Sequence, residues 1–387
     1  MGEMIYLDNA ATTFPKSNRV YETMDFYLRN KCVNAGRGGY RLAREATQLI
    51  DDTKHSLLSL LKLPQQRQVI FTPSATIALN QIIFGLEWDK FKNIYVTPFE
   101  HNAIMRPLHK IAKQYGATIH IIPFHKDTWE LDVTQLEKDF VINNPDYIFM
   151  SHMSNVTGYI LPCELIMKLA QKYEPVSVVD FSQSLGTIPI HEKVLEANFL
   201  VFAGHKSLYG PLGIGGFISD GRVLLQPVIV GGTGSDSLNL EMPESGDGRY
   251  EAASYNIQAI AGLNEAIKWI KDEGTYTIYD QKRKITTYLI SELNKLPQIK
   301  TYLPADLGHH SSIVSINIQD WTPSDLGVVL DEDFSIAVRT GYHCSPLIHE
   351  FLSTKETLGT VRISLGYFNT YHDVNELIRA LKEILEG

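Results

Sequence analysis

Short apolar runs alternate with amphipathic segments between about residues 66 and 220. The apolar runs have the length of buried strands, and the segments between them carry apolar residues at helical spacing. Predicted strands cover residues 68–71, 93–96, 118–122, 147–150, 176–179, 199–202 and 213–218. Predicted helices cover residues 75–86, 103–115, 133–140 and 164–173. Strands that alternate with helices predict βαβ units and an α/β fold with a mostly parallel, seven-stranded sheet.

The pattern changes after about residue 250. Two long helices are predicted over residues 256–271 and 275–296, and Pro297 ends the second. A smaller α+β pattern follows, with elements predicted over residues 312–316, 324–330, 360–364 and 372–385. The chain is thus predicted to form two domains, a large α/β domain of residues 15–255 and a small α+β domain of residues 1–14 and 256–387.

Composition is that of an ordinary globular protein, with 44% of the 387 residues hydrophobic and 20% charged. A net charge of -9 argues against a nucleic-acid partner, which would require a basic stripe. No apolar stretch is long enough for a transmembrane helix, so we expect no membrane partner. Cys32, Cys163 and Cys344 lie far apart and form no CxxC pair. This spacing predicts neither a disulfide framework nor a metal site, and it suits the reduced cytoplasm.

Lys206 is the first candidate for chemistry, because it follows the predicted strand 199–202. Ligands bind at such strand ends in α/β proteins. A lysine that loses hydration there has a lowered pKa, and its free amine attacks carbonyl groups. For an isolated lysine, a solvated loop position is the commoner case.

Two further strand ends carry candidates for ligand contacts. Residues 71–76 lead from a strand into a helix, where free N–H groups and the hydroxyls of Ser74 and Thr76 suit a phosphate. The alternative for this segment is a simple helix cap. His101 follows the next strand, where it could stack on a flat ring, move protons, or serve only as a capping or surface residue.

Three polar residues follow the predicted strands 147–150 and 176–179. Asn155 could donate to a phenolic oxygen, or residues 154–158 could form an ordinary turn. Asp180 ends an apolar strand, where its carboxylate needs a cation such as a protonated ring nitrogen, unless it only caps a helix. Gln183 adds a donor to the same crevice. Because parallel strands end at one edge of a sheet, we expect all these groups to meet there.

Together these residues suit pyridoxal 5'-phosphate. They offer a phosphate site, a ring stacker, a partner for the phenolic oxygen, a carboxylate for the ring nitrogen and a lysine for the Schiff base. An aspartate on the pyridinium nitrogen makes the ring an electron sink.

The chain resembles the class V aminotransferase-fold enzymes, specifically the cysteine desulfurases and selenocysteine lyases. The resemblance runs from residues 6–13 to residues 366–370. It implies a type I fold of the transferases that depend on pyridoxal phosphate, with Lys206 as the Schiff-base residue. It implies cofactor contacts from Ala75, Thr76, His101, Asn155, Asp180, Ser182, Gln183, His205 and Lys206. It also implies that Thr233, within residues 232–234, reaches the phosphate of a neighbouring subunit in a homodimer.

Cys344 lies in residues 339–347, beside His343 and near Arg339. A lone cysteine is usually a small buried hydrophobe. Positive neighbours, however, favour the thiolate, which is the nucleophile. The segment resembles the desulfurase group with an Arg-x-Gly-His-His-Cys-Ala pattern, from which it departs at Tyr342 and Ser345. Cys32 and Cys163 lack such surroundings, and we interpret both as structural.

Arg362 lies in the predicted strand 360–364. Arginine binds carboxylates with two parallel hydrogen bonds, and the resemblance implies that Arg362 holds the α-carboxylate of the substrate. The alternative is a surface salt bridge. Asn9, Ala10 and Arg339 are the other predicted substrate contacts. Asn34 and Arg37 are predicted to line the entrance.

The resulting hypothesis is a cysteine desulfurase that forms L-alanine and a persulfide on Cys344. In this interpretation Lys206 moves the Cα proton, and His101 carries the proton of the substrate thiol. The persulfide then passes to an acceptor protein. Three alternatives remain open at this point: a selenocysteine lyase acting on L-selenocysteine, a C–S lyase that releases sulfide and pyruvate, and a dimeric scaffold or sulfur-relay partner without activity.

Overall fold

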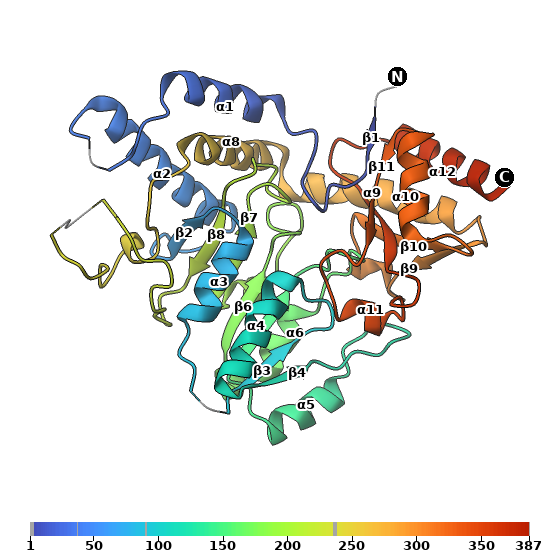
Figure 1. The fold of residues 1–387 in the computed structure, drawn as a ribbon, viewed down its shortest axis with the longest axis horizontal. Coiled ribbons are helices and arrows are strands. Elements are labelled where there is room, and N and C mark those ends of the chain that lie inside the picture. The colour runs from blue at the N-terminus through green and yellow to red at the C-terminus, as the bar shows by residue number, and fades with distance from the viewer. Residues whose placement is uncertain (1–3, 37, 90, 235–237, 387) are drawn as a thin grey trace.

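The computed structural model describes residues 4–36, 38–89, 91–234 and 238–386. A seven-stranded sheet forms the centre of the larger part of the molecule, in the order β2-β8-β7-β6-β5-β3-β4 (Figure 1). Only β8 runs antiparallel to its neighbours, so the predicted mostly parallel sheet is confirmed. The strands are β2 (Gln68–Thr72), β3 (Asn93–Val96), β4 (Thr118–Ile121), β5 (Tyr147–Ser151), β6 (Val176–Asp180), β7 (Phe199–Ala203) and β8 (Gly215–Ser219).

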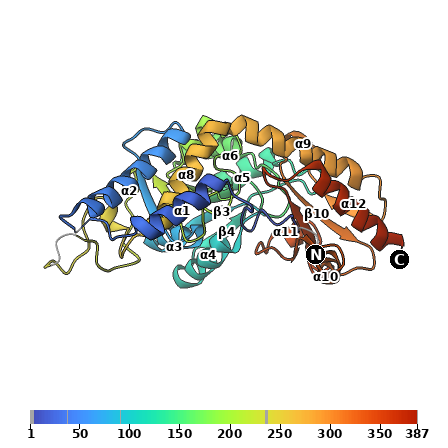
Figure 2. The same ribbon diagram turned by 90° about the horizontal axis from the view of Figure 1, so that it is seen from above.

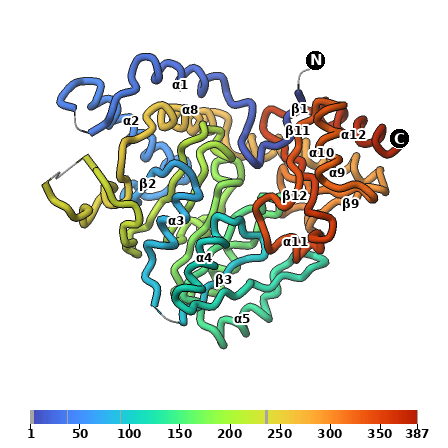
Figure 3. The backbone as a smooth tube through the Cα atoms, in the orientation of Figure 1, coloured from blue at the N-terminus to red at the C-terminus, as the bar shows by residue number. Residues whose placement is uncertain are grey.

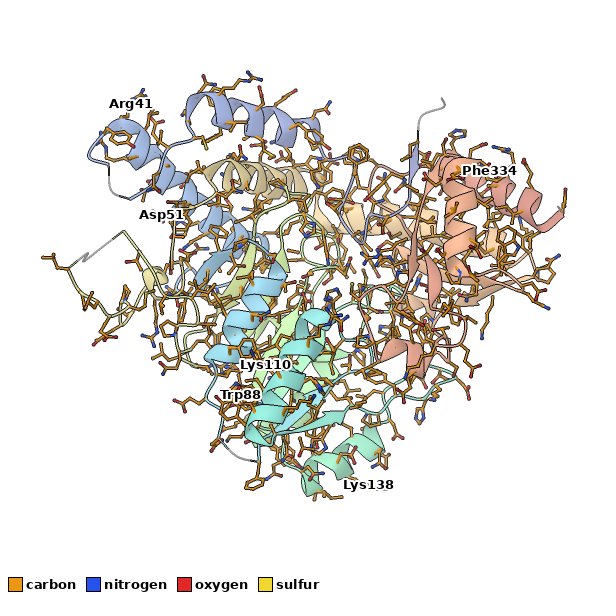
Figure 4. All side chains as sticks on the ribbon, viewed as in Figure 1. Arg41, Asp51, Trp88, Lys110, Lys138 and Phe334 are labelled. Carbon is orange, nitrogen blue, oxygen red and sulfur yellow. The ribbon has the colours of Figure 1, made fainter. Side chains whose placement is uncertain are left out.

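Helices cover both faces of this sheet, as expected when parallel strands are joined by helical crossovers (Figure 2). One face packs on α3 (Ala75–Gly85) and α4 (Asn102–Tyr115). The other packs on α2 (Arg41–Leu60), α5 (Val133–Ile142), α6 (Cys163–Ala170) and α8 (Ile257–Glu273). Charged side chains such as Arg41, at the start of α2, and Lys138, on α5, lie at the periphery of the molecule, away from the sheet (Figure 4). The sheet therefore has two buried faces, which explains the continuous apolar runs of its strands.

A second, smaller sheet has the order β12-β13-β10-β9 and is antiparallel. Its strands are β9 (Ile299–Tyr302), β10 (Ile313–Ile318), β12 (Arg339–Gly341) and β13 (Thr360–Ser364). Around it lie α9 (Thr275–Leu293), α10 (Pro323–Glu332), α11 (Ile348–Phe351) and α12 (Tyr371–Glu386). The N-terminal strand β1 (Ile5–Tyr6) joins this unit by pairing with β11 (Ile336–Ala337). The domain boundaries stay a prediction, and α8 itself packs against α1 and α2.

Several elements were not predicted from the sequence. They are the strands β1, β9, β11 and β12, the helices α1 (Asn18–Asn30), α2, α7 (Glu192–Leu195) and α11, and the 3-10 turns η2 (Asp247–Arg249) and η3 (Leu307–His309). The 3-10 turn η1 (Gln171–Tyr173) lies within the helix predicted over residues 164–173. Helix α1 packs against α8, buries only Val20 and exposes Phe26. Helix α2 has apolar residues at helical spacing, and they also pack against α8. In the described parts of the chain, no helix has the length and apolar character to cross a membrane.

Lys282, on α9, is only 6% exposed, and no described hydrogen bond or ion pair involves its amine. Burial lowers the pKa of this amine to about 8, so folding disfavours its charged form. We expect Lys282→Met to raise the free energy of unfolding at pH 7 by on the order of 3 kcal/mol. The unfolded lysine keeps its proton up to its ordinary pKa, so this gain fades as the pH rises from about 8 to about 10.5.

Urea unfolding of both proteins at pH 7 and above pH 10 measures this gain. Lys284→Met is the matched control, because Lys284 lies on the same helix and is exposed beside Asp280. Equal free energies of unfolding for the Lys282 and Lys284 variants at pH 7 would show that burial of the Lys282 amine does not destabilise the fold.

Candidate active site

The carboxyl ends of the large-sheet strands meet the amino ends of α3 and α4 around a cavity of about 40 Å³. The backbone trace shows these ends converging near the boundary with the smaller unit (Figure 3). The cavity is lined by Ala75, Thr76, His101, Ala103, Ser151, Met153, Asn155, Asp180, Ser182, Gln183 and Lys206. All five predicted features thus come together at one edge of the sheet, as the strand order requires.

Lys206 lies three residues beyond β7 and lines this cavity. None of the hydrogen bonds or ion pairs within the described residues involves its amine. Desolvation lowers the pKa of Lys206, Arg362 and Arg339 lower it further, and Asp180 partly offsets the shift. Low pKa and the absence of a described partner are what a lysine needs to act as a nucleophile.

Asp180 ends β6, and its carboxylate is oriented by Ser182. The backbone N–H of Ser182 donates to Asp180 Oδ1 over 2.8 Å, and its hydroxyl donates to the same oxygen over 2.5 Å. One carboxylate oxygen is thereby fixed, and the other has no protein donor among the described residues. The predicted phosphate contact of Ser182 stays a prediction, because its hydroxyl is directed to Asp180 here.

His101 combines the two roles that the sequence left open. It caps α4, since its Nδ1 accepts from the backbone N–H of Ala103 over 3.0 Å, and it also lines the cavity. Burial, together with the charges of Lys206, Arg339 and Arg362, lowers the pKa of His101 to about 3. The ring is therefore neutral at pH 7, with its proton on Nε2 because Nδ1 is an acceptor.

The start of α3, where the sequence predicts a phosphate site, lies at the cavity. Ser74 caps the helix by accepting from the N–H of Ile77, so the capping alternative holds for Ser74, while Ala75 and Thr76 line the cavity. A side chain at Gly215 would meet the backbone N of Ala75 at 2.9 Å, so the glycine allows β8 to pass directly beneath the start of this helix.

His205 adds an unused polar group. Its Nδ1 is buried and has no hydrogen-bond partner among the described residues. Burial, together with the charges of Lys206 and Lys16, lowers the pKa of His205 to about 4, so the ring is neutral. A buried polar atom without a partner is costly, which points to an absent ligand atom.

The N-terminal segment joins the cavity to the smaller unit. Gln183 Nε2 donates to the carbonyl of Ala10 over 2.8 Å. The N–H of Ala10 donates to Ser364 Oγ, and Asn9 Nδ2 donates to the carbonyl of Ser364. The predicted contacts of Asn9 and Ala10 with substrate stay predictions. Both residues line a small neighbouring hollow that shares Gln183 with the cavity.

Arg362, on β13, is 1% exposed, which rules out the surface salt bridge considered from the sequence. Its Nη2 lies 2.6 Å from Asp8 Oδ1, and its Nη1 donates to the carbonyl of Asn155 over 2.9 Å. Its Nε is buried and has no described partner. The guanidinium is thus held in place with its Nε–H unused by the described residues.

Cys344 lies in the exposed loop between β12 and α11, and its Sγ is 3.4 Å from Nη2 of Arg339. The carbonyl of Cys344 accepts from the N–H of Asn102, next to His101. His343 is buried, and desolvation lowers its pKa well below the ordinary value. The expectation that His343 adds positive charge near the thiol is therefore wrong, and Arg339 is the cation beside the sulfur.

The departures from the resembled pattern also have defined positions. The hydroxyl of Tyr342 donates to the carbonyl of Lys355, and its ring packs edge-on against His349.

The other two cysteines, Cys163 and Cys32, differ from each other in exposure. Cys163 is buried, and burial raises the pKa of its thiol. Cys32 is exposed, which does not fit the structural role expected of it.

Two predicted groups lie apart from the cavity. Thr233 belongs to a surface segment that follows β8 and does not line the cavity of its own chain. Asn34 is exposed in the loop after α1, and Arg37 lies outside the described residues. In the described part of the chain, no cluster of three or more His, Cys, Asp or Glu residues could hold a metal ion.

Comparison with known proteins decides the family. The model of the family described as aminotransferase class-V matches residues 5–377. The chain belongs to the class V aminotransferase family. A protein named probable cysteine desulfurase, from Pyrococcus abyssi (strain GE5 / Orsay), is 32% identical to this class V chain over 396 residues, which cover 100% of the chain and 95% of the relative.

Solved structures agree with this assignment. The apo structure of cysteine desulfurase from Thermococcus onnurineus NA1 superimposes with a TM-score of 0.90 at 30% identity, covering 99% of this chain and 95% of that one. The cysteine desulfurase CsdA (S-sulfonic acid) from Escherichia coli gives 0.86 at 26% identity, with the same coverage. The predicted family and type I fold are confirmed. The names of these relatives do not favour the selenocysteine lyase alternative.

Two residues of this class V chain were missed in the sequence. Asp8, the partner of Arg362, lies within residues 6–13, where an acidic residue among small polar ones signals a cation nearby. Glu100 is fully buried beneath the cavity wall, where its carboxylate accepts from Thr97 and from both donors of Ser151. Burial raises the pKa of Glu100 to about 7. A glutamate directly before a candidate histidine was the available signal.

Proposed function

We propose that this class V protein is a cysteine desulfurase, which converts L-cysteine to L-alanine and leaves the sulfur as a persulfide on Cys344. The observation that carries this proposal is a pair of reactive groups. The amine of Lys206, without a described partner, lines the cavity, and the thiol of Cys344 lies on a loop that is hydrogen-bonded to cavity residues. The names of the relatives support the same reaction.

The residues present fit pyridoxal 5'-phosphate as the cofactor. The free Nδ1 of His205 and the amino end of α3 suit a phosphate, and the second oxygen of Asp180 suits a ring nitrogen. His101 would lie against the ring, and Asn155 and Gln183 would contact its oxygen. When bound, the cofactor supplies a carbonyl for the amine of Lys206 and an electron sink for the substrate.

The residues of this chain then have separable roles. Arg362 would bind the α-carboxylate of L-cysteine with its free Nε and its oriented guanidinium, with Arg339 as a second cation at the entrance. Lys206, with its lowered pKa, would take and return the proton at Cα. His101, neutral with its proton on Nε2, would hold a proton for the substrate thiol.

Sulfur transfer would be carried out by Cys344. Its thiolate attacks the sulfur of the substrate, so that a sulfur–sulfur bond forms as the carbon–sulfur bond breaks, and the electron pair of the broken bond ends with a proton on the carbon. L-Cysteine and the Cys344 thiol thus become L-alanine and the Cys344 persulfide. A thiol reductant or an acceptor protein then takes the terminal sulfur.

A product assay tests the proposed reaction. The protein loaded with pyridoxal phosphate is incubated with L-cysteine and a thiol reductant, and alanine, sulfide and pyruvate are measured. We expect alanine and sulfide in equal amounts and no pyruvate. Pyruvate in place of alanine would establish a C–S lyase, and turnover of L-selenocysteine alone would establish a selenocysteine lyase.

Arg362→Ala is expected to raise the KM for L-cysteine by about 10- to 100-fold, the loss of a charge-assisted hydrogen-bonded contact. The turnover number should fall less, because the reacting atoms lie elsewhere. Steady-state kinetics of alanine formation measures both. Arg379→Ala is the control, since Arg379 forms exposed ion pairs in the same unit, away from the cavity. A KM equal to that of wild type in a folded Arg362 variant would remove Arg362 from the substrate site.

A homodimer is part of the proposal. The segment after β8 carries apolar side chains that are almost fully exposed in the single chain, including Val230, Leu238 and Leu240. Such residues favour burial against a partner, and a second copy would bring Thr233 to the cofactor phosphate of its neighbour. Three unpaired cysteines support the predicted cytoplasmic location.

A further inference from the structure

The loop that carries Cys344 is tied to the cavity through the side-chain amide of Asn155. Ser345 Oγ donates to Asn155 Oδ1 over 2.7 Å, and Asn155 Nδ2 donates to the carbonyl of His343 over 2.8 Å. All three residues are buried. Both ends of one amide are therefore bound to the two residues that flank the reactive cysteine.

These two bonds fix the orientation of the amide. The carbonyl of His343 can only accept, so it requires the nitrogen of Asn155 on its side. The Ser345 hydroxyl, which lies on the other side, donates a hydrogen bond to the amide oxygen. One N–H of Asn155 then remains unused by the described residues, and Asn155 lines the cavity. The oriented amide thus presents a donor toward the space proposed for the cofactor ring.

The loop itself needs such ties. His343 and Cys344 have φ angles of 48° and 58°, a left-handed conformation that is unfavourable for two consecutive residues with side chains. Strained backbone persists only where its surroundings hold it. Here the holding contacts include the Asn155 amide, the contact of the His343 ring with Thr360, and the N–H of Asn102, which donates to the carbonyl of Cys344 over 2.7 Å.

We propose that Ser345 is a positioning residue, which couples the order of the Cys344 loop to the cofactor pocket by orienting the amide of Asn155. The inference rests on the proposed function for its biological meaning. The desulfurase pattern that the segment resembles has alanine at this position, so the coupling through a hydroxyl is a property of this chain. For the same reason Ser345→Ala is expected to fold.

Two measurements on protein loaded with pyridoxal phosphate test the coupling in Ser345→Ala. The rate of alkylation of Cys344 by iodoacetamide, followed by peptide mass analysis, should rise about fivefold, as expected for the loss of one hydrogen bond. The pH midpoint of the absorbance of the bound cofactor should move upward by about half a unit. A fixed donor favours the more negative form of the cofactor, and this variant lets the donor turn away.

Ser353→Ala is the matched control, because Ser353 is exposed in the same unit and its hydroxyl makes no described hydrogen bond. It should leave both quantities unchanged. An unchanged pH midpoint in Ser345→Ala would overturn the proposal, even with faster alkylation, because the hydroxyl would then order the loop without acting on the pocket. Should Ser345→Ala not fold, Ser345→Gly removes the same hydroxyl. Neither readout needs turnover, so a failure of the proposed reaction would be seen separately in the product assay.

Discussion

Replacement of Lys206 by alanine is expected to lower the rate of alanine formation by about a thousandfold or more, with the fold intact. Lys206 is the one lysine among the residues that line the described cavity, and desolvation lowers its pKa, which favours the free amine. Positioned proton transfer alone contributes about 10²- to 10⁴-fold to a rate, and the amine has a second role in holding the cofactor. Initial rates at saturating L-cysteine measure the loss.

Lys206→Arg separates charge from nucleophilicity in the same assay. Arginine keeps the positive charge near Asp180 but stays protonated, so it can neither attack a carbonyl nor accept a proton. It should be as inactive as the alanine variant, and neither variant should show the absorbance of the lysine-bound cofactor. Retention of most of the activity by Lys206→Arg would mean that Lys206 only supplies charge.

The second large effect is expected for Cys344→Ala, which should lose alanine and sulfide formation by about a hundredfold or more while still binding the cofactor. The variant lacks the group that takes the sulfur, whereas the cavity residues that bind cofactor and carboxylate remain. L-Cysteine should therefore still change the absorbance of the bound cofactor. Product formation and the spectrum are measured on the same sample.

Cys32→Ala is the matched control for this experiment, because Cys32 is the other exposed thiol. Its activity should equal that of wild type. Loss of activity in Cys32→Ala together with full activity in Cys344→Ala would show that Cys32, and not Cys344, takes the sulfur. Formation of pyruvate by Cys344→Ala would indicate that the Cys344 thiol, in the wild-type protein, diverts the substrate from a C–S lyase reaction.

The arrangement of the cavity could be predicted because it depends on topology. In a parallel sheet the strand ends meet at one edge, so Asp180 and Lys206, which follow neighbouring strands, had to lie close together. The strands themselves were visible as apolar runs, since both faces of the sheet are buried. Helix α1 left no comparable signal, because it buries only Val20.

The long-range contacts around the site could not be predicted in the same way. The Asp8–Arg362 ion pair and the Ser345–Asn155 hydrogen bond connect residues that are 354 and 190 positions apart. No local pattern specifies such pairings: the first depends on how the N-terminal segment packs within the small unit, and the second on how the small unit packs against the large one. The neutral state of His343 could not be predicted either, because its charge is disfavoured by burial, which depends on the folded structure.

The most direct test of the account is the mass of Cys344 after one turnover. Protein loaded with pyridoxal phosphate is mixed with one equivalent of L-cysteine in the absence of reductant, alkylated, and digested for mass spectrometry. The account predicts that the peptide containing Cys344 gains the mass of one sulfur atom, which a thiol reductant removes, while the Cys32 and Cys163 peptides are unchanged. Alanine formation with no added sulfur on Cys344 would contradict it.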